Sequence, residues 1–318
     1  MDSSRASTIT EAIISNVAKV IVGKNDILKK ICICLYSNGH ILLEDIPGTG
    51  KTTLIKALAK TIGCESKRIQ FTPDLMPSDV TGFSFYNQKQ QEFVFKAGAV
   101  FTNLLLADEI NRATPRTQSS LLECMEERQV TIDGETHKLS RPFFVFATQN
   151  PVETQGTFPL PEAQLDRFFM RLSMGYPTNE SEAEMLRRFK ESSPLDNLPA
   201  VVSPEDIIEI QGYITTVKVA DSIYNYIVKI ADSTRKNEGL KLGVSPRGTL
   251  ALLRASQACA AVNGRSYVIP DDVKEVSIDV LSHRIITSGH NSIGMSAAAR
   301  EAIRLTLAAV PAPVESEL

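Results

Sequence analysis

The sequence is poor in cysteine, and its cysteines show no arrangement typical of a disulfide framework or a metal site. The chain has 318 residues and five cysteines, with no C-x-x-C pair and no histidine at metal-ligand spacing. Reduced thiols in or near a core are typical of cytosolic proteins. The pattern therefore favours a cytoplasmic protein over a disulfide-stapled secreted one. The cysteines are Cys32, Cys34, Cys64, Cys124 and Cys259.

Long apolar runs and a large charge excess are also missing. No run approaches the roughly 20 apolar residues that span a bilayer, and residues 1–5 lead into no apolar segment of the signal-peptide kind. The formal net charge of −3 provides no basic field that would favour nucleic acid or an anionic membrane. We therefore expect no membrane insertion and no nucleic-acid partner. The length allows one large domain or two medium ones.

A glycine-rich stretch, D-I-P-G-T-G-K-T-T, begins at Asp45 between an apolar run and an amphipathic segment. Gly48 and Gly50 let the backbone curl so that its N–H groups point inward, and the helix that follows adds partial positive charge. Lys51 can reach the β- and γ-phosphates of a nucleotide, and Thr52 can ligate Mg²⁺. The stretch predicts a phosphate-binding loop, although Asp45 stands where a glycine would ease the turn.

Polar residues follow two other buried-strand patterns. The apolar run 104–107 ends in Asp108 and Glu109, and the run 143–147 ends shortly before Asn150. Parallel strands buried on both faces are continuous apolar runs, and ligands bind at their carboxyl ends. Asp108 can therefore hold the Mg²⁺ shell and Glu109 can polarise a water. Asn150 can hydrogen-bond the γ-phosphate or that water.

Residues 8–22 carry apolar side chains at helical spacing and run into Val22-Gly23-Lys24. A purine needs apolar walls and nearby backbone amides, which this turn can supply. The turn either lines an adenine pocket or simply ends a helix, and these residues alone leave both readings open.

Two hairpins are predicted near the strand runs. Residues 83–95 contain two short strand patterns around a polar turn, and residues 130–139 contain two more around Asp133-Gly134. Large aromatics on a surface hairpin usually mark a contact. The aromatics of the first hairpin either form such a contact or pack on the domain, and both readings stay open. They are Phe83, Phe85, Phe93 and Phe95.

With these motifs in this order, the sequence resembles the AAA+ ATPases and, within them, the MoxR family. The resemblance rests on stretches 44–52, 106–113, 147–151, 156–168 and 244–247 and covers nearly the whole chain. It implies an α/β fold, a P-loop AAA+ core with a central parallel sheet of order 5-1-4-3-2, followed by a C-terminal all-helical lid domain. The core would occupy 1–177 with hairpin inserts at 83–95 and 130–139, the lid 178–309 and a flexible tail 310–318.

The resemblance also implies a role for each site residue. Residues 48–53 would form Walker A, Asp108 and Glu109 Walker B, and Asn150 sensor 1. Arg167 would be the arginine finger, with Arg116 and Arg128 open as alternatives, and Arg247 would be sensor 2. The expected catalytic residues are Lys51, Asp108, Glu109, Asn150, Arg167 and Arg247. The expected nucleotide-binding residues are Val22, Gly23, Asp45, Pro47, Gly48, Thr49, Gly50, Lys51, Thr52 and Thr53, and the expected Mg²⁺ ligands are Thr52 and Asp108.

The activity implied by the resemblance is Mg²⁺-dependent ATP hydrolysis in a ring, expected to be a hexamer. ATP would lie between the core and lid of one subunit, with Arg167 supplied by a neighbour and Arg247 sensing the γ-phosphate. The ring would be a chaperone-like remodeller or maturation factor for protein complexes, with a von Willebrand factor A domain protein among its clients. Alternatives are an ATP-gated assembly or binding module, a chelatase-type ATPase subunit and, last, a DNA-translocating motor, whose hairpins should be more basic.

Overall fold

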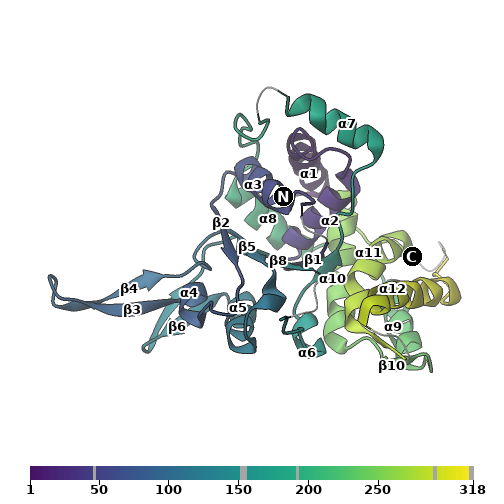
Figure 1. Cartoon of the computed structure of the whole chain (residues 1–318). Helices are drawn as coiled ribbons and strands as arrows, with labels where there is room; N and C mark the ends of the chain where they lie inside the picture. The colour runs from purple at the N-terminus through teal and green to yellow at the C-terminus, as the bar shows by residue number, and fades with distance from the viewer. Residues whose placement is uncertain (46–47, 151–155, 191–192, 289–291, 315–318) are drawn as a thin grey trace.

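A five-stranded parallel sheet forms the centre of the molecule (Figure 1). The structure, a computed structural model, describes residues 1–45, 48–150, 156–190, 193–288 and 292–314. The sheet order is β2-β5-β8-β1-β9, which reads 5-1-4-3-2 from the β9 edge when these strands alone are counted along the chain. The strands are β1 (Ile41–Glu44), β2 (Ser66–Gln70), β5 (Leu104–Asp108), β8 (Phe144–Gln149) and β9 (Met170–Leu172).

The apolar runs that predicted buried strands do bury both faces of the sheet. Along β5, Leu104 and Leu106 pack into one hydrophobic cluster, whereas Leu105 and Ala107 pack into another. Successive side chains of a strand point to opposite faces, so each inner strand needs apolar residues at every position. The edge strand β2 instead exposes residues 66–68. The predicted α/β fold class is confirmed.

Helices cover both faces of the sheet (Figure 1). The first cluster is completed by helices from both ends of the chain, and the second by two helices from the middle. One hydrophobic cluster therefore joins the N-terminal helices to the C-terminal ones. The first set is α1 (Ser3–Val17), α2 (Asn25–Tyr36), α3 (Lys51–Ile62), α8 (Pro204–Ile214), α9 (Asp221–Arg235), α10 (Pro246–Val262), α11 (Pro270–Leu281) and α12 (Ser292–Ala309), and the second is α4 (Pro77–Thr81) and α5 (Pro115–Glu127).

Capping serines and prolines start helices of the C-terminal region. Ser203 and Ser245 accept hydrogen bonds from backbone N–H groups of the first turns of α8 and α10, and each is followed by proline at the first helical position. Within the described residues, no helix is long and apolar enough to cross a membrane. The remaining helical elements are α6 (Glu162–Leu165), α7 (Asn179–Arg188) and the 3₁₀ turns η1 (Ile110–Arg112) and η2 (Ser282–Arg284).

The C-terminal region differs from the all-helical expectation in one detail. The strands β10 (Leu240–Leu242) and β11 (Ile286–Thr287) form a short antiparallel ladder, which the N–H of Ser288 extends by donating to the carbonyl of Gly239. These two connecting segments run side by side, so pairing satisfies backbone groups that neither segment satisfies alone. Short ladders of this kind have no apolar run that would reveal them in the sequence.

Both predicted hairpins are present. They consist of β3 (Gly82–Asn87) with β4 (Glu92–Ala97), and of β6 (Gln129–Ile132) with β7 (Glu135–Lys138). The β3–β4 hairpin projects away from the body of the molecule (Figure 1). Phe95 stacks on His137 of the other hairpin at a ring-centroid distance of 3.9 Å, whereas Phe93 is 76% exposed. Phe95 therefore packs within the protein, whereas for the exposed Phe93 a contact surface stays a prediction.

Candidate nucleotide site

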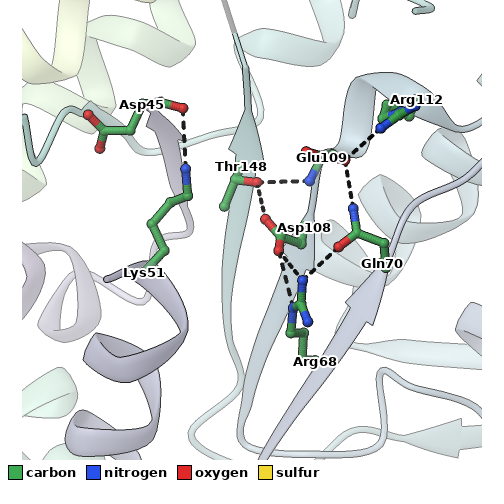
Figure 2. A network of polar contacts seen from close by, with 8 residues as sticks. All are labelled: Asp45, Lys51, Arg68, Gln70, Asp108, Glu109, Arg112 and Thr148. Atoms are coloured by element: carbon green, nitrogen blue, oxygen red, sulfur yellow. Dashed lines mark hydrogen bonds and ion pairs between the residues drawn. The ribbon is translucent and has the colours of Figure 1, made fainter. Parts of the chain in front are cut away.

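The glycine loop connects β1 to α3 at the carboxyl end of the sheet. Gly48 and Gly50 have φ angles of +83° and +85°, a left-handed conformation that glycine adopts at little cost. The first N–H groups of α3 have no partner within the helix, and they face the region where an anion would bind. Lys51 Nζ donates to the backbone carbonyl of Asp45 at 3.2 Å (Figure 2). Pro47, also predicted for this loop, lies outside the described residues.

The side chain of Asp45 points away from Lys51 (Figure 2). Asp45 is 4% exposed, and its carboxylate accepts hydrogen bonds from the hydroxyl of Ser173 at 2.9 Å and from the N–H groups of Met174 and Gly175 at 2.6 and 3.0 Å. The carboxylate therefore ties the start of the loop to the segment after β9. This explains why a buried acid occupies a position where glycine is usual, and it gives the side chain a structural rather than a ligand-facing role.

A buried threonine joins the two predicted acidic residues. The hydroxyl of Thr148 on β8 donates to Asp108 Oδ1 at 2.6 Å and accepts from the N–H of Glu109 at 2.8 Å (Figure 2). Glu109 has a φ of +55°, a left-handed conformation that costs a non-glycine residue on the order of 1 kcal/mol. The bridge through Thr148 stabilises this backbone conformation of Glu109 and orients the carboxylate of Asp108.

Three side chains outside the predicted set pair with these carboxylates (Figure 2). Arg68 on β2 donates to Asp108 Oδ2 through Nη2 at 2.7 Å and Nε at 3.1 Å. Gln70 Nε2 donates to Glu109 Oε2 at 2.8 Å, and Arg112 Nη1 donates to the same oxygen at 3.3 Å. The strand register causes this arrangement, because Gln70 lies opposite Asp108 in the parallel β2–β5 pair.

One polar cavity of about 660 Å³ gathers most of the predicted residues from distant parts of the chain. Lysine and helix N–H groups lie on one wall and carboxylates on another. Such a cavity can hold a polyphosphate together with a divalent cation, because Mg²⁺ prefers oxygen ligands and commonly shares phosphate oxygens. The predicted residues that line it are Asp45, Gly48, Gly50, Lys51, Thr52, Thr53, Asp108, Glu109 and Asn150.

An apolar cavity of about 730 Å³ lies on the other side of the same loop. Val22 forms part of its wall, as does Thr49, and α7 closes it with Met185 and Leu186. Gly23 passes so close to α7 that a Cβ there would meet Ser181 Oγ at 2.2 Å. The turn at 22–24 thus lines a pocket and does more than end a helix. The two cavities share Gly48, Gly50 and Thr53.

Arg167 and Arg247 lie together, away from both cavities. Glu126 pairs with Arg167 Nε at 3.3 Å and with Arg247 Nη2 at 2.5 Å, and all three line a separate cavity of about 320 Å³. In this arrangement Arg247 lines neither of the two cavities of its own subunit, and its contact with the γ-phosphate stays a prediction. A tertiary contact explains the position of Arg247. The hydroxyl of Ser245, the cap of α10, donates to Asp166 at 3.1 Å and holds the start of the helix beside α6.

Arg128, an alternative for the finger, is engaged in the fold. Its guanidinium donates to the carbonyl oxygens of Phe143, at 3.1 Å, and Asn38, and burial lowers its pKa. Arg116, the other alternative, is exposed in the first turn of α5. Arg128 is therefore poorly placed to reach another subunit, whereas Arg116 remains an alternative candidate for the arginine finger.

Comparison with known proteins places this site in a family. Residues 40–170 match the ATPase family associated with various cellular activities (AAA), and residues 232–303 match the AAA lid domain. A Mycobacterium tuberculosis protein named Chaperone MoxR1 is 42% identical over 285 residues, which cover 87% of this chain and 75% of that protein. The chain belongs to the MoxR family of AAA+ ATPases. This MoxR chain is also 50% identical to the uncharacterized protein YeaC of Bacillus subtilis, over 95% of this chain and 94% of that one.

The fold of this MoxR chain is shared with a solved structure. A crystal structure of a candidate ATPase from Cytophaga hutchinsonii superimposes with a TM-score of 0.88 at 40% identity, covering 98% of this chain and 97% of that one. The AAA match contains the glycine loop, the acidic residues Asp108 and Glu109 and the amide Asn150, and the lid match contains Arg247. Within the MoxR site, the sequence reading missed Arg68, Gln70, Arg112 and Thr148. The polar residues of β2, Arg68 and Gln70, could be assigned to the site only once the structure showed that β2 neighbours β5.

Proposed function

We propose that this MoxR-family chain binds ATP with Mg²⁺ and hydrolyses it. The observation that carries the proposal is the meeting of two cavities at the glycine loop, a polar one walled by Lys51, Asp108 and Glu109 and an apolar one walled by Val22. A nucleotide has the same division, with a charged polyphosphate at one end and an apolar purine at the other. The phosphates would lie at the N-terminus of α3 and the purine between Val22 and α7. Residues 1–177 would form the core and residues 178–309 the lid.

The polar cavity offers suitable oxygen ligands for Mg²⁺. Asp108 supplies a carboxylate, and Thr52, in the first turn of α3, supplies a hydroxyl to the same cavity. Few protein ligands suffice, because Mg²⁺ in such sites keeps waters and shares phosphate oxygens. When bound, the ion neutralises charge that develops on the phosphates.

The chain's own residues divide the remaining work. Lys51 and the loop N–H groups hold the phosphates through charge-assisted hydrogen bonds. Glu109 accepts a hydrogen bond from the attacking water and orients it, and Asn150, on the same cavity wall, holds the γ-phosphate or that water. Phosphoryl transfer depends mainly on such positioning and on charge stabilisation.

We further propose a ring in which each site is completed by a neighbour. Arg167 and Arg247 share Glu126 and lie on one face, apart from the nucleotide cavities of their own subunit. Both side chains are partly exposed, Arg167 at 34% and Arg247 at 49%. A neighbouring subunit that docks against this face would receive both arginines at its phosphates, and an arginine finger contributes roughly 10³ to 10⁵ in rate.

The first test is ATP hydrolysis per subunit against protein concentration, with Mg²⁺. The native chain should gain specific activity as concentration rises, and Arg167→Ala should stay flat while still binding ATP. Arg116→Ala is the control for the open alternative and should behave as the native chain. Specific activity that does not depend on protein concentration and survives the loss of Arg167 would refute the proposal of a site shared between subunits.

A mixing experiment separates a shared site from a site complete within one subunit. Glu109→Gln subunits keep the finger but cannot polarise water, whereas Arg167→Ala subunits keep Glu109 but lack the finger. Each variant alone should be inactive, and a mixture should recover activity where an intact arginine meets an intact Glu109. No recovery, with both variants binding ATP, would contradict the proposal. The same mixture with Arg247→Ala tests the second arginine.

The ring would remodel protein clients. Support comes from a relative named as a chaperone and, through the family resemblance, from an expected client with a von Willebrand factor A domain. Glu109→Gln held on ATP should retain clients during a pull-down, and the same variant with Lys51→Ala added should not. Recovery of the same proteins by both would count against an ATP-dependent client.

A further inference from the structure

The guanidinium of Arg68 occupies the carboxylate that the proposed metal would need. Two of its nitrogens, Nη2 and Nε, donate to the same oxygen, Asp108 Oδ2, at 2.7 and 3.1 Å. The other oxygen, Oδ1, accepts from the hydroxyl of Thr148 at 2.6 Å. Both oxygens of Asp108 are therefore engaged, and a cation already balances its charge.

The sheet explains how Arg68 reaches this position. Arg68 lies opposite Leu106 in the β2–β5 register, two residues before the end of β2, so its side chain shares a face with that of Gln70. Its long stem extends along the strand to Asp108, and Nη2 also donates to Gln70 Oε1 at 2.8 Å. Ile69, between them, packs against the hydrophobic cluster on the opposite face.

The pair can open without disrupting the fold. The side chain of Arg68 is 50% exposed because β2 is an edge strand, whereas that of Asp108 is 15% exposed. The guanidinium can therefore move into solvent while Asp108 stays bridged to Thr148. A divalent cation at Asp108 would repel a guanidinium a few ångströms away, so the two cations compete for one carboxylate.

We propose that Arg68 is a positioning residue that holds Asp108 in the metal-free site and must leave it when Mg²⁺ binds, so that Arg68 sets the Mg²⁺ concentration required for nucleotide binding. This inference rests on the proposed nucleotide function. It adds a role for a residue of the edge strand that contacts the metal ligand but is not itself a ligand.

The experiment is a Mg²⁺ titration of the binding of a fluorescent, non-hydrolysable ATP analogue. Arg68→Ala should reach half-saturation at an about tenfold lower Mg²⁺ concentration than the native chain, because a charge-assisted pair no longer competes. Arg68→Lys should fall between the two, since lysine keeps the charge but cannot donate through two fixed nitrogens.

Two further variants make the result decisive. Lys67→Ala removes an exposed cation from the adjacent position of β2 and should leave the Mg²⁺ requirement unchanged. Arg68→Gln is a second uncharged variant, in case the alanine chain does not fold. An unchanged Mg²⁺ requirement in the Arg68 variants would overturn the inference. Weaker binding with and without Mg²⁺ would overturn it too, because Arg68 would then be a phosphate ligand. A native chain that binds no nucleotide at any Mg²⁺ concentration would instead refute the proposed function.

Discussion

Replacing Asp166 by asparagine should destabilise the protein through the charge of Arg284. The side chain of Arg284 is 2% exposed, and its Nε donates to Asp166 Oδ1 at 2.7 Å. Its other nitrogens donate to the carbonyl oxygens of Asp166, Phe168, Phe169 and Val280. Burial lowers the pKa of Arg284, and the charge of Asp166 opposes that shift. Asparagine keeps the shape of the acceptor but removes the compensating charge.

The size of the effect follows from the environment of the pair. Removing one partner of a buried ion pair costs about 3–5 kcal/mol, because the remaining charge stays buried and uncompensated. The side chain of Asp166 is 20% exposed, and carbonyl oxygens still accept from Arg284, so the lower end applies. We expect Asp166→Asn to lower the free energy of unfolding by about 3 kcal/mol.

Urea unfolding of the native chain and of two variants measures this difference. The matched control is Asp232→Asn, since Asp232 pairs with Lys236 on the surface, where the side chains are 46% and 76% exposed. A pair of that kind contributes at most about 1 kcal/mol. A destabilisation by Asp166→Asn no larger than that of the control would refute the argument that Arg284 depends on a charged partner.

Substitutions at three other residues give further predictions: His40, which precedes β1, and Asp45 and Lys51, which belong to the loop region. Burial lowers the pKa of His40 to about 3, so between pH 6.5 and 3 only the unfolded chain takes up a proton at this residue. On account of His40, the free energy of unfolding should therefore decrease by up to about 1.4 kcal/mol for each unit by which the pH is lowered through this range. Urea unfolding should show a shallower pH dependence for His40→Gln, and an unchanged slope would contradict this. Asp45→Ala should lower the free energy of unfolding by about 2 kcal/mol, because it leaves buried N–H groups unpaired, and Asp45→Asn should lower it less. Equal losses in urea unfolding would argue against the structural role of the Asp45 carboxylate. ATP at 100 times its dissociation constant should raise the free energy of unfolding of the native chain by about 2.7 kcal/mol. The same ATP concentration should raise that of Lys51→Ala by nearly nothing. An equal rise in both chains would show that Lys51 does not bind the nucleotide.

The sequence predicted the parts of the site that depend on local order. The strand, glycine loop and helix around Lys51 are consecutive, and left-handed turns favour glycine, so a short stretch determines their geometry. Asp108 and Asn150 could be placed because each follows a buried parallel strand, and the carboxyl ends of such strands meet at one edge of the sheet. The fold class followed from the same apolar runs.

Tertiary structure decided which side chains meet across elements. Arg68 contacts Asp108 only because β2 is the strand next to β5, and strand order is not written in either segment. Arg247 lies beside Arg167 because the cap of α10 binds Asp166, a contact between residues far apart in the chain. Local sequence therefore determined the loop and the strand ends, whereas long-range packing determined what pairs with Asp108 and which face of the chain carries the arginines.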